Sequence, residues 1–518
     1  MAIPYSHLAA GLFVTWVLYS LLRSVFTKIQ TRRKARALGC LPAKDISKPF
    51  FGIGTYLELA KAAKEKRALE AARESFAVGG HTFQRTILGL KALNTLEPEN
   101  IKAILATQFS DFDLGARHRL FFPLLGNGIF TLDGAGWSHS RAMLRPQFAR
   151  EQVADVGMLG EHVDQLFHAI PSDGTAFDIQ DYFFRLTLDT ATEFLFGEST
   201  HCLSPQKASA TGPLAIAGGE KGFAYAFNAS QDGLIHRARA QNFYWLVNPR
   251  RFREAVKLVH DVVDYYVDQA LAKQNHSEEE KFIGNTESRY VFLEAVARET
   301  QDRIALRDQM LNILLAGRDT TASLLSSSFY YLSRHPQVWA RLRTEILNIF
   351  PATQTADRIT IERLREVKYL RYFLNEVLRL IPPVSFNSRW ATTDTTLPVG
   401  GGPDGKSPIF VPKGQKVNYS VALMHRRRDL WGEDAEDFRP ERWEENSKHG
   451  WEYLPFNGGP RICLGQQYAL AEASYVLVRL LQKFERVENA QPELTQPDLR
   501  ISLTVAHASV KVRLYAAA

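Results

Sequence analysis

The sequence predicts a mainly α-helical protein with small β-sheets, preceded by one membrane-spanning helix at its N-terminus. An uncharged apolar run covers residues 8–22. Long segments with helical spacing of apolar residues fill the body of the chain, and strand-like segments with Gly and Pro turns gather in its C-terminal half. No linker or repeat divides the 518 residues, so we expect a single catalytic domain after the membrane helix.

The apolar run predicts a membrane anchor. It extends to residue 26 if Arg23 snorkels toward the lipid headgroups, which gives about the 20 residues that a spanning helix needs. No basic residue precedes Arg23, whereas several follow it up to Arg36, so the positive-inside rule places the rest of the chain in the cytosol. A cleaved signal peptide would need a positively charged start and a small-residue cleavage site, and neither is present.

Composition and charge set the boundaries of the chain's parts. We expect an anchor over residues 1–27, a basic, proline-containing hinge over 28–50, and the catalytic domain over 51–518. The formal net charge of +7 forms no concentrated basic stripe, so we do not expect a nucleic-acid binder. The cysteine count of three is odd and low, which argues against a disulfide framework and suits a reducing compartment.

Helical periodicity marks the longest elements of the body. Pro249 stands in the first turn of one such segment, where its missing N–H costs nothing. The expected helices cover residues 248–274, 302–332, 335–349, 360–381 and 464–484, with short strands over 395–419 and a loop over 202–219.

Residues 400–407 (GGGPDGKS) match the expression of a phosphate-binding loop. That loop works only where a helix begins at the Lys and points its N–H groups at the ligand. Here Pro408 follows, and the chain continues as strand and turn. We therefore interpret the segment as a glycine-rich hairpin loop.

Residues 456–465 (FNGGPRICLG) carry the strongest chemical signal. Their glycines let the backbone approach a flat ligand closely. Cys463 stands just before an expected helix, whose free N–H groups and dipole favour a thiolate over a thiol. Arg461 offers a guanidinium fork for a carboxylate. These features favour an iron ligand and a haem propionate partner over the alternative, a buried structural cysteine.

The pattern FxxGxRxCxG, filled by Phe456, Gly459, Arg461, Cys463 and Gly465, resembles the haem-binding signature of the cytochrome P-450 superfamily. The resemblance implies the cytochrome P-450 fold and a haem b whose iron is bound by the Cys463 thiolate, with Phe456, Arg461 and Gly465 as haem contacts. It also implies a monooxygenase that inserts one oxygen atom of O2 into a C–H bond of a hydrophobic substrate.

Glu376 and Arg379 fit the E-x-x-R motif of the family, and their spacing puts both on one face of a helix. Arg442, in the segment FRPERW, resembles the second arginine that joins this pair. The resemblance implies a structural network behind the haem. A lone E-x-x-R is more often a solvated surface pair, so the motif carries weight only with the others.

Residues 316–321 (AGRDTT) resemble the oxygen-activation motif of the family. The resemblance implies that Gly317 leaves room for O2, that Thr320 hydrogen-bonds the bound oxygen, and that Asp319 relays protons. A threonine in a helix can instead bond to its own helix carbonyl. Ala316 stands where animal fatty-acid hydroxylases often carry a Glu bound covalently to haem, so we expect non-covalent haem.

Trp137 and Arg141 fit the family's W-x-x-x-R, which contacts a haem propionate. Arg389, after the turn Pro382-Pro383, is a further propionate candidate. A core aromatic is the alternative interpretation for Trp137 alone.

Residues 244–267, 430–443 and 456–473 resemble the fungal alkane and fatty-acid hydroxylases, a branch that oxidises terminal carbons of long chains. Residues 381–386 depart from the pattern of that branch in a stretch that lines the substrate pocket. Relatives of the branch also oxidise alkyl carbons of polyketides or peptides in secondary-metabolite pathways, so both substrate classes stay open. Apolar residues expected by position to line the pocket are Phe121, Phe122, Leu314, Leu315, Val384, Phe386 and Leu503.

The implied cycle takes electrons from NADPH through a separate reductase, because no flavin or nicotinamide motif is visible. Its docking face would be basic, with residues 426–428 as candidates and a solvated surface as the alternative. The resemblance implies a single-pass protein of the endoplasmic reticulum membrane with a cytosolic catalytic domain. A haem-thiolate isomerase or dehydratase and a haem-binding sensor remain alternatives, although the pair Asp319–Thr320 favours oxygenation.

Overall fold

The computed structural model describes residues 5–148, 157–204, 219–277, 290–353, 358–446 and 449–517. The chain forms two compact units. The strand-rich unit comprises Met1–Tyr56, Glu74–Asp113 and Ser388–Tyr419, and the helical unit comprises Leu57–Arg73, Leu114–Asn387 and Ser420–Ala518. The described residues are mainly helical with small sheets, so the expected fold class is confirmed.

The strand-rich unit is built on a six-stranded sheet in the order β1-β2-β3-β9-β6-β4. Its central hairpin is antiparallel and closes through Leu88 and Gly89, whose φ angles of 48° and 78° suit a two-residue hairpin turn. The strands are β1 (Lys44–Asp45), β2 (Thr82–Ile87), β3 (Leu90–Thr95), β4 (Phe112–Asp113), β6 (Phe386–Ala391) and β9 (Lys416–Ser420), with β7 (Thr395–Gly401) and β8 (Ser407–Val411) as a separate hairpin. Short helical segments of this unit are η1 (Phe50–Gly52), α4 (Pro98–Lys102), η2 (Ala103–Thr107) and η3 (Phe109–Asp111).

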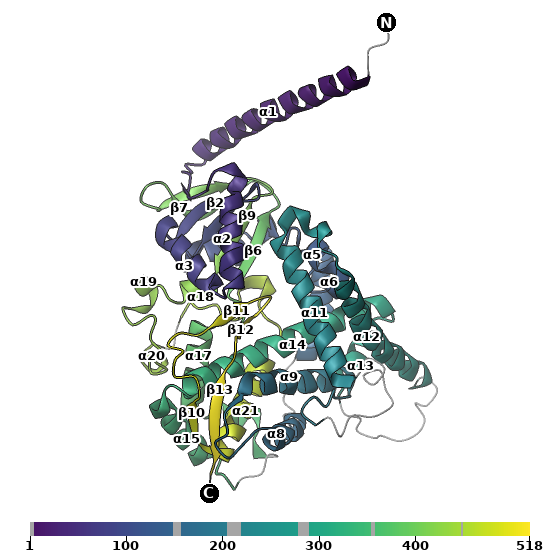
Figure 1. Cartoon of the computed structure of the whole chain (residues 1–518), viewed down its shortest axis with the longest axis vertical. Helices are drawn as coiled ribbons and strands as arrows, with labels where there is room; N and C mark the ends of the chain where they lie inside the picture. The colour runs from purple at the N-terminus through teal and green to yellow at the C-terminus, as the bar shows by residue number, and fades with distance from the viewer. Residues whose placement is uncertain are drawn as a thin grey trace. The chain divides into compact units, whose positions relative to one another are not determined.

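The first helix, α1, runs from Tyr5 to Ala37. Its stretch Leu12–Ala37 is the one helix, among the described residues, that is long and apolar enough to cross a membrane. The helix continues without a break past residue 28, so the first part of the expected hinge is helical (Figure 1). Near its C-terminal end, Lys34 forms an ion pair of 2.6 Å with Asp394.

The glycine-rich segment 400–407 is a hairpin loop, as expected. It lies at the end of β7 and the start of β8, which pair as antiparallel strands. Gly400 and Gly402 have φ angles of 109° and 78°, which only glycine adopts readily. In this described segment, β8 rather than a helix follows Lys406, so its backbone does not form a phosphate-binding loop.

The helical unit is organised around α14 (Arg303–Leu332). The Asp302 carboxylate caps this helix by accepting the N–H groups of Ile304 and Ala305. Figure 1 shows α14 crossing the unit beside α9 (Ile179–Phe196), and the two helices are in contact. Its other long helices are α5 (Arg117–Leu125), α6 (Gly134–Leu144), α8 (Gly157–Ala169), α11 (Gly219–Arg239), α12 (Arg250–Ser277), α15 (Pro336–Ile349), α17 (Lys368–Leu380) and α21 (Gln466–Lys483).

Short elements complete the helical unit. Its sheets are the three-stranded β10-β13-β5 and the two-stranded β11-β12. The strands are β5 (Phe177–Asp178), β10 (Phe484–Asn489), β11 (Leu499–Ile501), β12 (Val505–His507) and β13 (Lys511–Ala516). The short helices are η4 (Arg145–Phe148), η6 (Gln241–Leu246), α13 (Phe292–Ala297), α16 (Ile361–Leu364), α18 (Val421–Met424), α19 (Arg428–Trp431), α20 (Arg442–Glu445) and η8 (Gly459–Arg461), while α2 (Ile53–Lys64) and α3 (Ala68–Gly79) each have residues in both units.

Four of the five expected helices occur within a few residues of their predicted ends, as α12, α14, α15 and α21. The expected helix over 360–381 is wrong as a single element. Its first turns form α16, which ends in a tight turn where the Glu366 N–H donates to the Arg363 carbonyl at 3.0 Å. A second helix, α17, then begins at Lys368. Of the loop expected over 202–219, residues 205–218 lie outside the described part of the chain.

Candidate active site

Cys463 lies in a loop that enters α21. Its N–H donates to the Phe456 carbonyl at 3.0 Å, which closes the loop around the glycines. Gly459 has a φ of 69°, and a Cβ on Gly458 would lie 2.9 Å from the Trp451 ring. The fold itself therefore favours glycine at both positions. At Gly465 a Cβ would make only an ordinary contact with Phe148, so this glycine is not required by its protein neighbours.

The Cys463 side chain is accessible to solvent although protein atoms crowd around its thiol. Protein atoms surround the thiol, and this burial raises its pKa, while a hydrogen bond from the Gly465 N–H and the Arg141 charge act in the opposite direction. The side chain is nevertheless exposed rather than packed against neighbours. The Gly465 N–H at the helix start thus favours the thiolate, as expected, but desolvation has the larger effect on the pKa of the thiol in the metal-free chain. A metal ion bound at Cys463 would replace the thiol proton and stabilise the thiolate.

A strip of partly exposed residues interrupts the buried surface of α14. From Leu306 onward, the helix is buried except at Arg307, Ala316, Gly317 and Thr320. A Cβ on Gly317 would meet no atom within 4 Å. The strip therefore borders empty space in the middle of a helix that is otherwise packed on all sides. Because α14 contacts α21, whose first residues follow the cysteine loop, the residues present fit a flat group bound by Cys463.

Thr320 and Asp319 have different surroundings. The Thr320 hydroxyl donates to the Ala316 carbonyl of its own helix at 2.7 Å, which is the alternative to a bond with bound oxygen. The hydroxyl oxygen can still accept a hydrogen bond from another group. Asp319 is 4% exposed and lies 3.2 Å from Arg318, and burial raises its pKa. Arg318 in turn donates to Asn228. The carboxyl of Asp319 is thus buried and does not form part of the open strip.

Arg461, Trp137 and Arg141 form one cluster beside the cysteine loop. The Arg461 guanidinium lies over the Trp137 ring at 4.4 Å and forms an ion pair of 2.7 Å with Asp133. The Arg141 guanidinium lies 5.8 Å from the same ring and donates to the Ile462 carbonyl, next to Cys463. Two guanidinium groups on one indole ring can bind carboxylates such as haem propionates.

Arg389 belongs to β6 of the strand-rich unit. It is buried, and its guanidinium donates to the Ser388 carbonyl at 2.8 Å. Its expected contact with a propionate stays a prediction.

Glu376, Arg379 and Arg442 are brought together. The Glu376 carboxylate and the Arg379 guanidinium are fully buried and form two hydrogen bonds of 2.8 Å. Arg442 lies 3.5 Å from the same carboxylate. The Trp443 indole N–H and the Arg439 backbone N–H also donate to Glu376. The Glu376–Arg379 pair is satisfied by protein groups, so no ligand is needed to explain it, while the buried Arg442 Nε has no hydrogen-bond partner among the described residues.

The expected pocket residues, including Phe386 at the start of β6, all fall within the residue ranges of the helical unit, and their surroundings differ. Phe121 and Leu503 are half-buried and pack against the core cluster that contains Leu315. Phe122 and Val384 are exposed at 48% and 39%, and Phe386 is half-buried. Leu314 and Leu315 are 0% and 8% exposed and belong to the same buried core cluster, so their place in the substrate pocket stays a prediction.

The basic run 426–428 does not form an open cationic face. Arg426 is ion-paired with Glu436 and donates to the Leu380 carbonyl, and Arg427 pairs with Asp429. Both side chains are at most one-tenth exposed. Arg428 alone is open, at 67%, and it lies 3.3 Å from Glu433. The expected reductase contact at Arg426 and Arg427 is therefore wrong.

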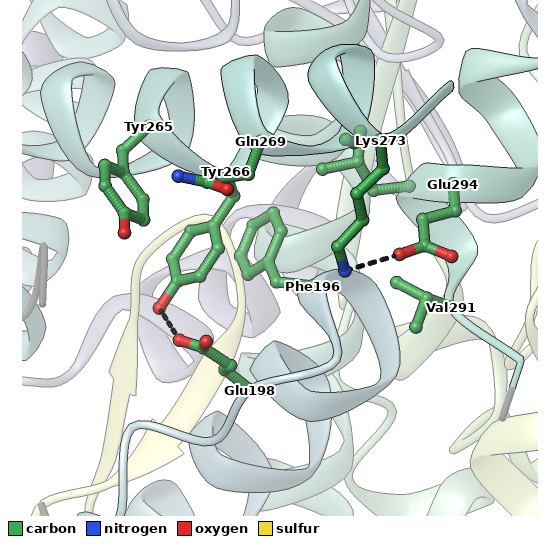
Figure 2. Close-up of a pocket in the computed structure, with 10 residues that line it drawn as sticks. Phe196, Glu198, Tyr265, Tyr266, Gln269, Lys273, Val291 and Glu294 are labelled. Carbon is green, nitrogen blue, oxygen red and sulfur yellow. Dashed lines mark hydrogen bonds and ion pairs between the residues drawn. The ribbon is translucent and has the colours of Figure 1, made fainter. Parts of the chain in front are cut away.

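A separate pocket lies beside α12 (Figure 2). The Phe196 ring stacks on Tyr266, whose hydroxyl donates to Glu198, and Lys273 pairs with Glu294. Its volume of about 130 Å³ is below the roughly 300–1,000 Å³ of small-molecule sites. None of the expected pocket residues lines it, so we do not assign the substrate to it.

Three residues at or near the site escaped the sequence analysis. Asp133 holds Arg461 in place. The buried His425 ring joins α17 to the cysteine loop: its Nδ1 lies 3.1 Å from the Arg379 carbonyl, and its Nε2 accepts the Leu454 N–H. Glu472 on α21 is buried and accepts from Thr190, and burial raises its pKa to about 7. An acidic residue inside an apolar helical segment was the available signal for Glu472.

Comparisons with known proteins agree with this geometry. The family model described as Cytochrome P450 matches residues 45–512. Cytochrome P450 52A12 of Debaryomyces hansenii is 50% identical over 497 residues, which are 95% of each chain. Cytochrome P450 52A3-B of Candida maltosa is 51% identical over 88% of each chain, and Cytochrome P450 52A6 of Candida tropicalis is 52% identical over 82% of each.

Proposed function

Because this chain belongs to the cytochrome P450 family and is therefore a haem-thiolate monooxygenase, we propose that it hydroxylates long-chain alkanes or fatty acids. The resemblance to a fungal branch of the family is confirmed by the similar yeast proteins. The observation that carries the substrate proposal is identity of 50% over 95% of both chains with a protein of that branch.

As a member of the family, the protein uses a haem iron bound by a thiolate, with O2 and electrons derived from NADPH. The haem supplies the oxygen-activating chemistry. We assign the iron ligand to Cys463, whose side chain is exposed while Cys40 and Cys202 are buried. We assign the propionate contacts to Arg141 and Arg461, with Trp137 between them, because they form the cationic cluster next to the cysteine loop.

The chain's own residues position substrate, oxygen and protons. Gly317 leaves space on the open strip, since a Cβ there would touch no neighbour. Thr320 borders the same space, and its hydroxyl oxygen can accept a hydrogen bond while its proton is donated to Ala316. The Asp319 carboxyl is the nearby group that can pass protons toward the open strip. To do so, it must exchange its ion pair with Arg318 for a hydrogen bond to water. Phe121, Leu315 and Leu503 supply apolar surface for the substrate.

The membrane anchor is helix α1, and we place the protein in the endoplasmic reticulum membrane with the catalytic domain in the cytosol. The absence of basic residues before Arg23 and the cluster after it support this orientation. Electrons come from a separate reductase, as in the family generally, and the partner we propose is an NADPH-dependent one.

A second substrate class is the alkyl carbon of a polyketide or peptide secondary metabolite. The observation that favours it is the departure of residues 381–386 from the pattern of the alkane and fatty-acid branch. Within that stretch Val384 is exposed at 39% and Phe386 is half-buried, so both side chains are available to a ligand.

The test is turnover by the full chain in vesicles with a fungal NADPH-dependent reductase. Hexadecane and dodecanoic acid are compared with an alkyl-bearing polyketide, and products are identified by mass spectrometry. Terminal alcohols from the linear substrates support the proposal, and oxidation of the polyketide alone favours the second class. Product formation without consumption of NADPH would overturn oxygenation and favour an isomerase or dehydratase.

A further inference from the structure

Two polar side chains on consecutive turns of α14 are buried and bind a loop. Asp308 and Asn312 are 1% and 0% exposed. They contact residues 125–132, which run from the end of α5 toward α6 and which we call the anchored loop. The Asp308 carboxylate accepts the Asn127 N–H of this loop at 2.7 Å. Because a buried polar group is costly unless it is hydrogen-bonded, these bonds fix the position of the loop on α14.

Asn312 uses both ends of its amide. Its oxygen accepts the Phe130 N–H at 3.0 Å, and its nitrogen donates to the Leu125 carbonyl at 2.9 Å and to the Asp308 carbonyl of its own helix at 2.7 Å. The fit is close, because a Cβ on Gly128 would lie 2.2 Å from the Asn312 nitrogen. An amide supplies the acceptor and both donors, whereas an aliphatic side chain of similar size supplies neither.

The anchored loop is held next to the open strip of α14, which comprises Ala316, Gly317 and Thr320. Asn312, Ala316 and Thr320 are spaced four residues apart, so they lie on one face of the helix, with about 6 Å of rise between one and the next. The bonds of Asn312 therefore hold the loop one turn before the point where the helix becomes accessible.

The other side of the loop contacts the arginine that we assign to a haem propionate. The Arg461 guanidinium donates to the Leu132 carbonyl at 2.9 Å and to the Ile129 carbonyl at 3.4 Å. The anchored loop thus joins the cationic cluster of the cofactor site to the turn of α14 that precedes the strip. Backbone in this position bounds the space over the strip at the end nearest to Asn312.

We propose that Asn312 is a positioning residue: by holding the anchored loop, it sets the end wall of the substrate space and so determines which carbon of a linear substrate comes to lie beside Thr320. The inference rests on the proposed function, since it needs a chain-like substrate. Asn312 is fully buried, so it acts on the substrate only through the loop. A fixed wall keeps a hydrocarbon chain at one depth, whereas a loosened wall lets neighbouring carbons reach the same place.

The experiment measures which carbons of dodecanoic acid are hydroxylated by the haem-loaded full chain with a fungal NADPH-dependent reductase. Mass spectrometry identifies the positional isomers. Asn312→Leu keeps the bulk of the side chain and removes its three hydrogen bonds. We expect the ratio of hydroxylation at inner carbons to hydroxylation at the favoured carbon to rise by about threefold or more, while the carbon monoxide spectrum of the reduced haem stays unchanged.

A second variant loosens the loop without a change in α14. The buried Thr131 hydroxyl accepts the Gly128 N–H at 2.9 Å and donates to the Gly126 carbonyl at 2.7 Å, so Thr131→Val removes a clip inside the anchored loop at nearly constant volume. We expect its product ratio to shift in the same direction as that of Asn312→Leu. This variant carries the test if Asn312→Leu does not retain haem.

The matched control is Ser327→Ala, which removes a buried bond of 3.0 Å between α14 and His507, on β12 rather than on the loop. Its product ratio should equal that of the parent. An equal shift in this control would overturn the proposal, because any disturbance of α14 would then suffice. Unchanged ratios in the loop variants, with an active parent, would overturn it as well. A parent that oxidises no linear substrate would overturn the proposed substrate class and this inference with it.

Discussion

The Cys463 loop and the Glu376–Arg379 cluster are both specified by short motifs, yet they are built in opposite ways. Cys463 is exposed, and a Cβ on Gly317 of α14 would meet no atom within 4 Å. The carboxylate of Glu376 and the guanidinium of Arg379 are 0% exposed and satisfied by each other and by backbone carbonyls.

This difference distinguishes Cys463, which is open to a ligand, from the Glu376–Arg379 pair, which stabilises the fold. Cys463 is exposed and accepts a hydrogen bond from the Gly465 N–H, so its thiol stays open to a bound group. A buried ion pair with every donor used is explained by the polypeptide alone. The two regions should therefore respond differently to substitution.

Substitution of the ligand should have the largest effect. In Cys463→Ser the red-shifted Soret band of the reduced carbon monoxide complex should disappear, and turnover should fall by more than about 10³-fold. Thermal unfolding of the haem-free chain should change little, because the thiol makes few contacts. A retained red-shifted band would show that the thiolate comes from another residue and would remove the basis of the comparison.

Substitution within the Glu376–Arg379 cluster should lower the free energy of unfolding. Glu376→Gln leaves the buried Arg379 charge without its partner, so we expect a loss of about 3–5 kcal/mol in unfolding free energy, together with loss of haem. Denaturant unfolding followed by circular dichroism measures it. The control is Arg428→Ala, which removes a surface pair exposed at 67% and 89% and should change stability by less than about 0.5 kcal/mol.

Glu472 differs from Glu376, because it is a buried carboxyl without a cation in hydrogen-bond contact. Burial raises its pKa from 4.5 to about 7. Between these values the folded chain keeps the proton that the unfolded chain releases, so unfolding free energy falls as pH rises, by about 3 kcal/mol in all. Glu472→Gln should remove this slope. Parallel pH profiles of variant and parent would contradict a raised pKa.

Thr320→Ala tests whether the open strip acts on oxygen chemistry. We expect product formed per NADPH oxidised to fall by roughly 10- to 100-fold, with more peroxide released. Ser326→Ala is the matched control, because Ser326 makes the same type of bond to a carbonyl one turn earlier, at 2.6 Å, but is fully buried. Equal losses in both variants would mean that only the helix was perturbed.

The smallest effect is expected at Gly317. Gly317→Ala should raise helix stability by about 0.5–1 kcal/mol, because its Cβ meets nothing, while it lowers turnover by crowding the strip. Gly233→Ala in α11 should do the reverse and destabilise the fold, since a Cβ there would lie 2.1 Å from the Phe252 ring. Melting temperature and turnover are measured together on both variants.

The sequence predicted the long helices and the hairpin at 400–407 because periodicity, caps and glycines are local signals. It also named the members of the charged cluster, since Glu376 and Arg379 are neighbours on one helix. The split of residues 360–381 was not predicted, because the turn at Glu366 carries no Gly or Pro.

Long-range surroundings were beyond prediction. Arg426 and Arg427 are mostly buried, and their charges are neutralised by ion pairs with Glu436 and Asp429. A run of arginines in the sequence does not reveal these acidic partners. Leu314 and Leu315 are adjacent and equally apolar, so only the packing of α14 separates the fully buried residue from its neighbour. His425 links two distant segments, and only the folded backbone brings Leu454 to its ring.

The accessibility of the three cysteines has a consequence for the life of the protein before haem is inserted. Cys40 and Cys202 are buried, and Cys463 alone is open. A newly made chain therefore offers electrophiles and oxidants a single target, and that target is the residue the finished protein depends on. Loading with haem removes this vulnerability, so the fraction of chains that a thiol reagent can alkylate is a direct count of those still waiting for their cofactor.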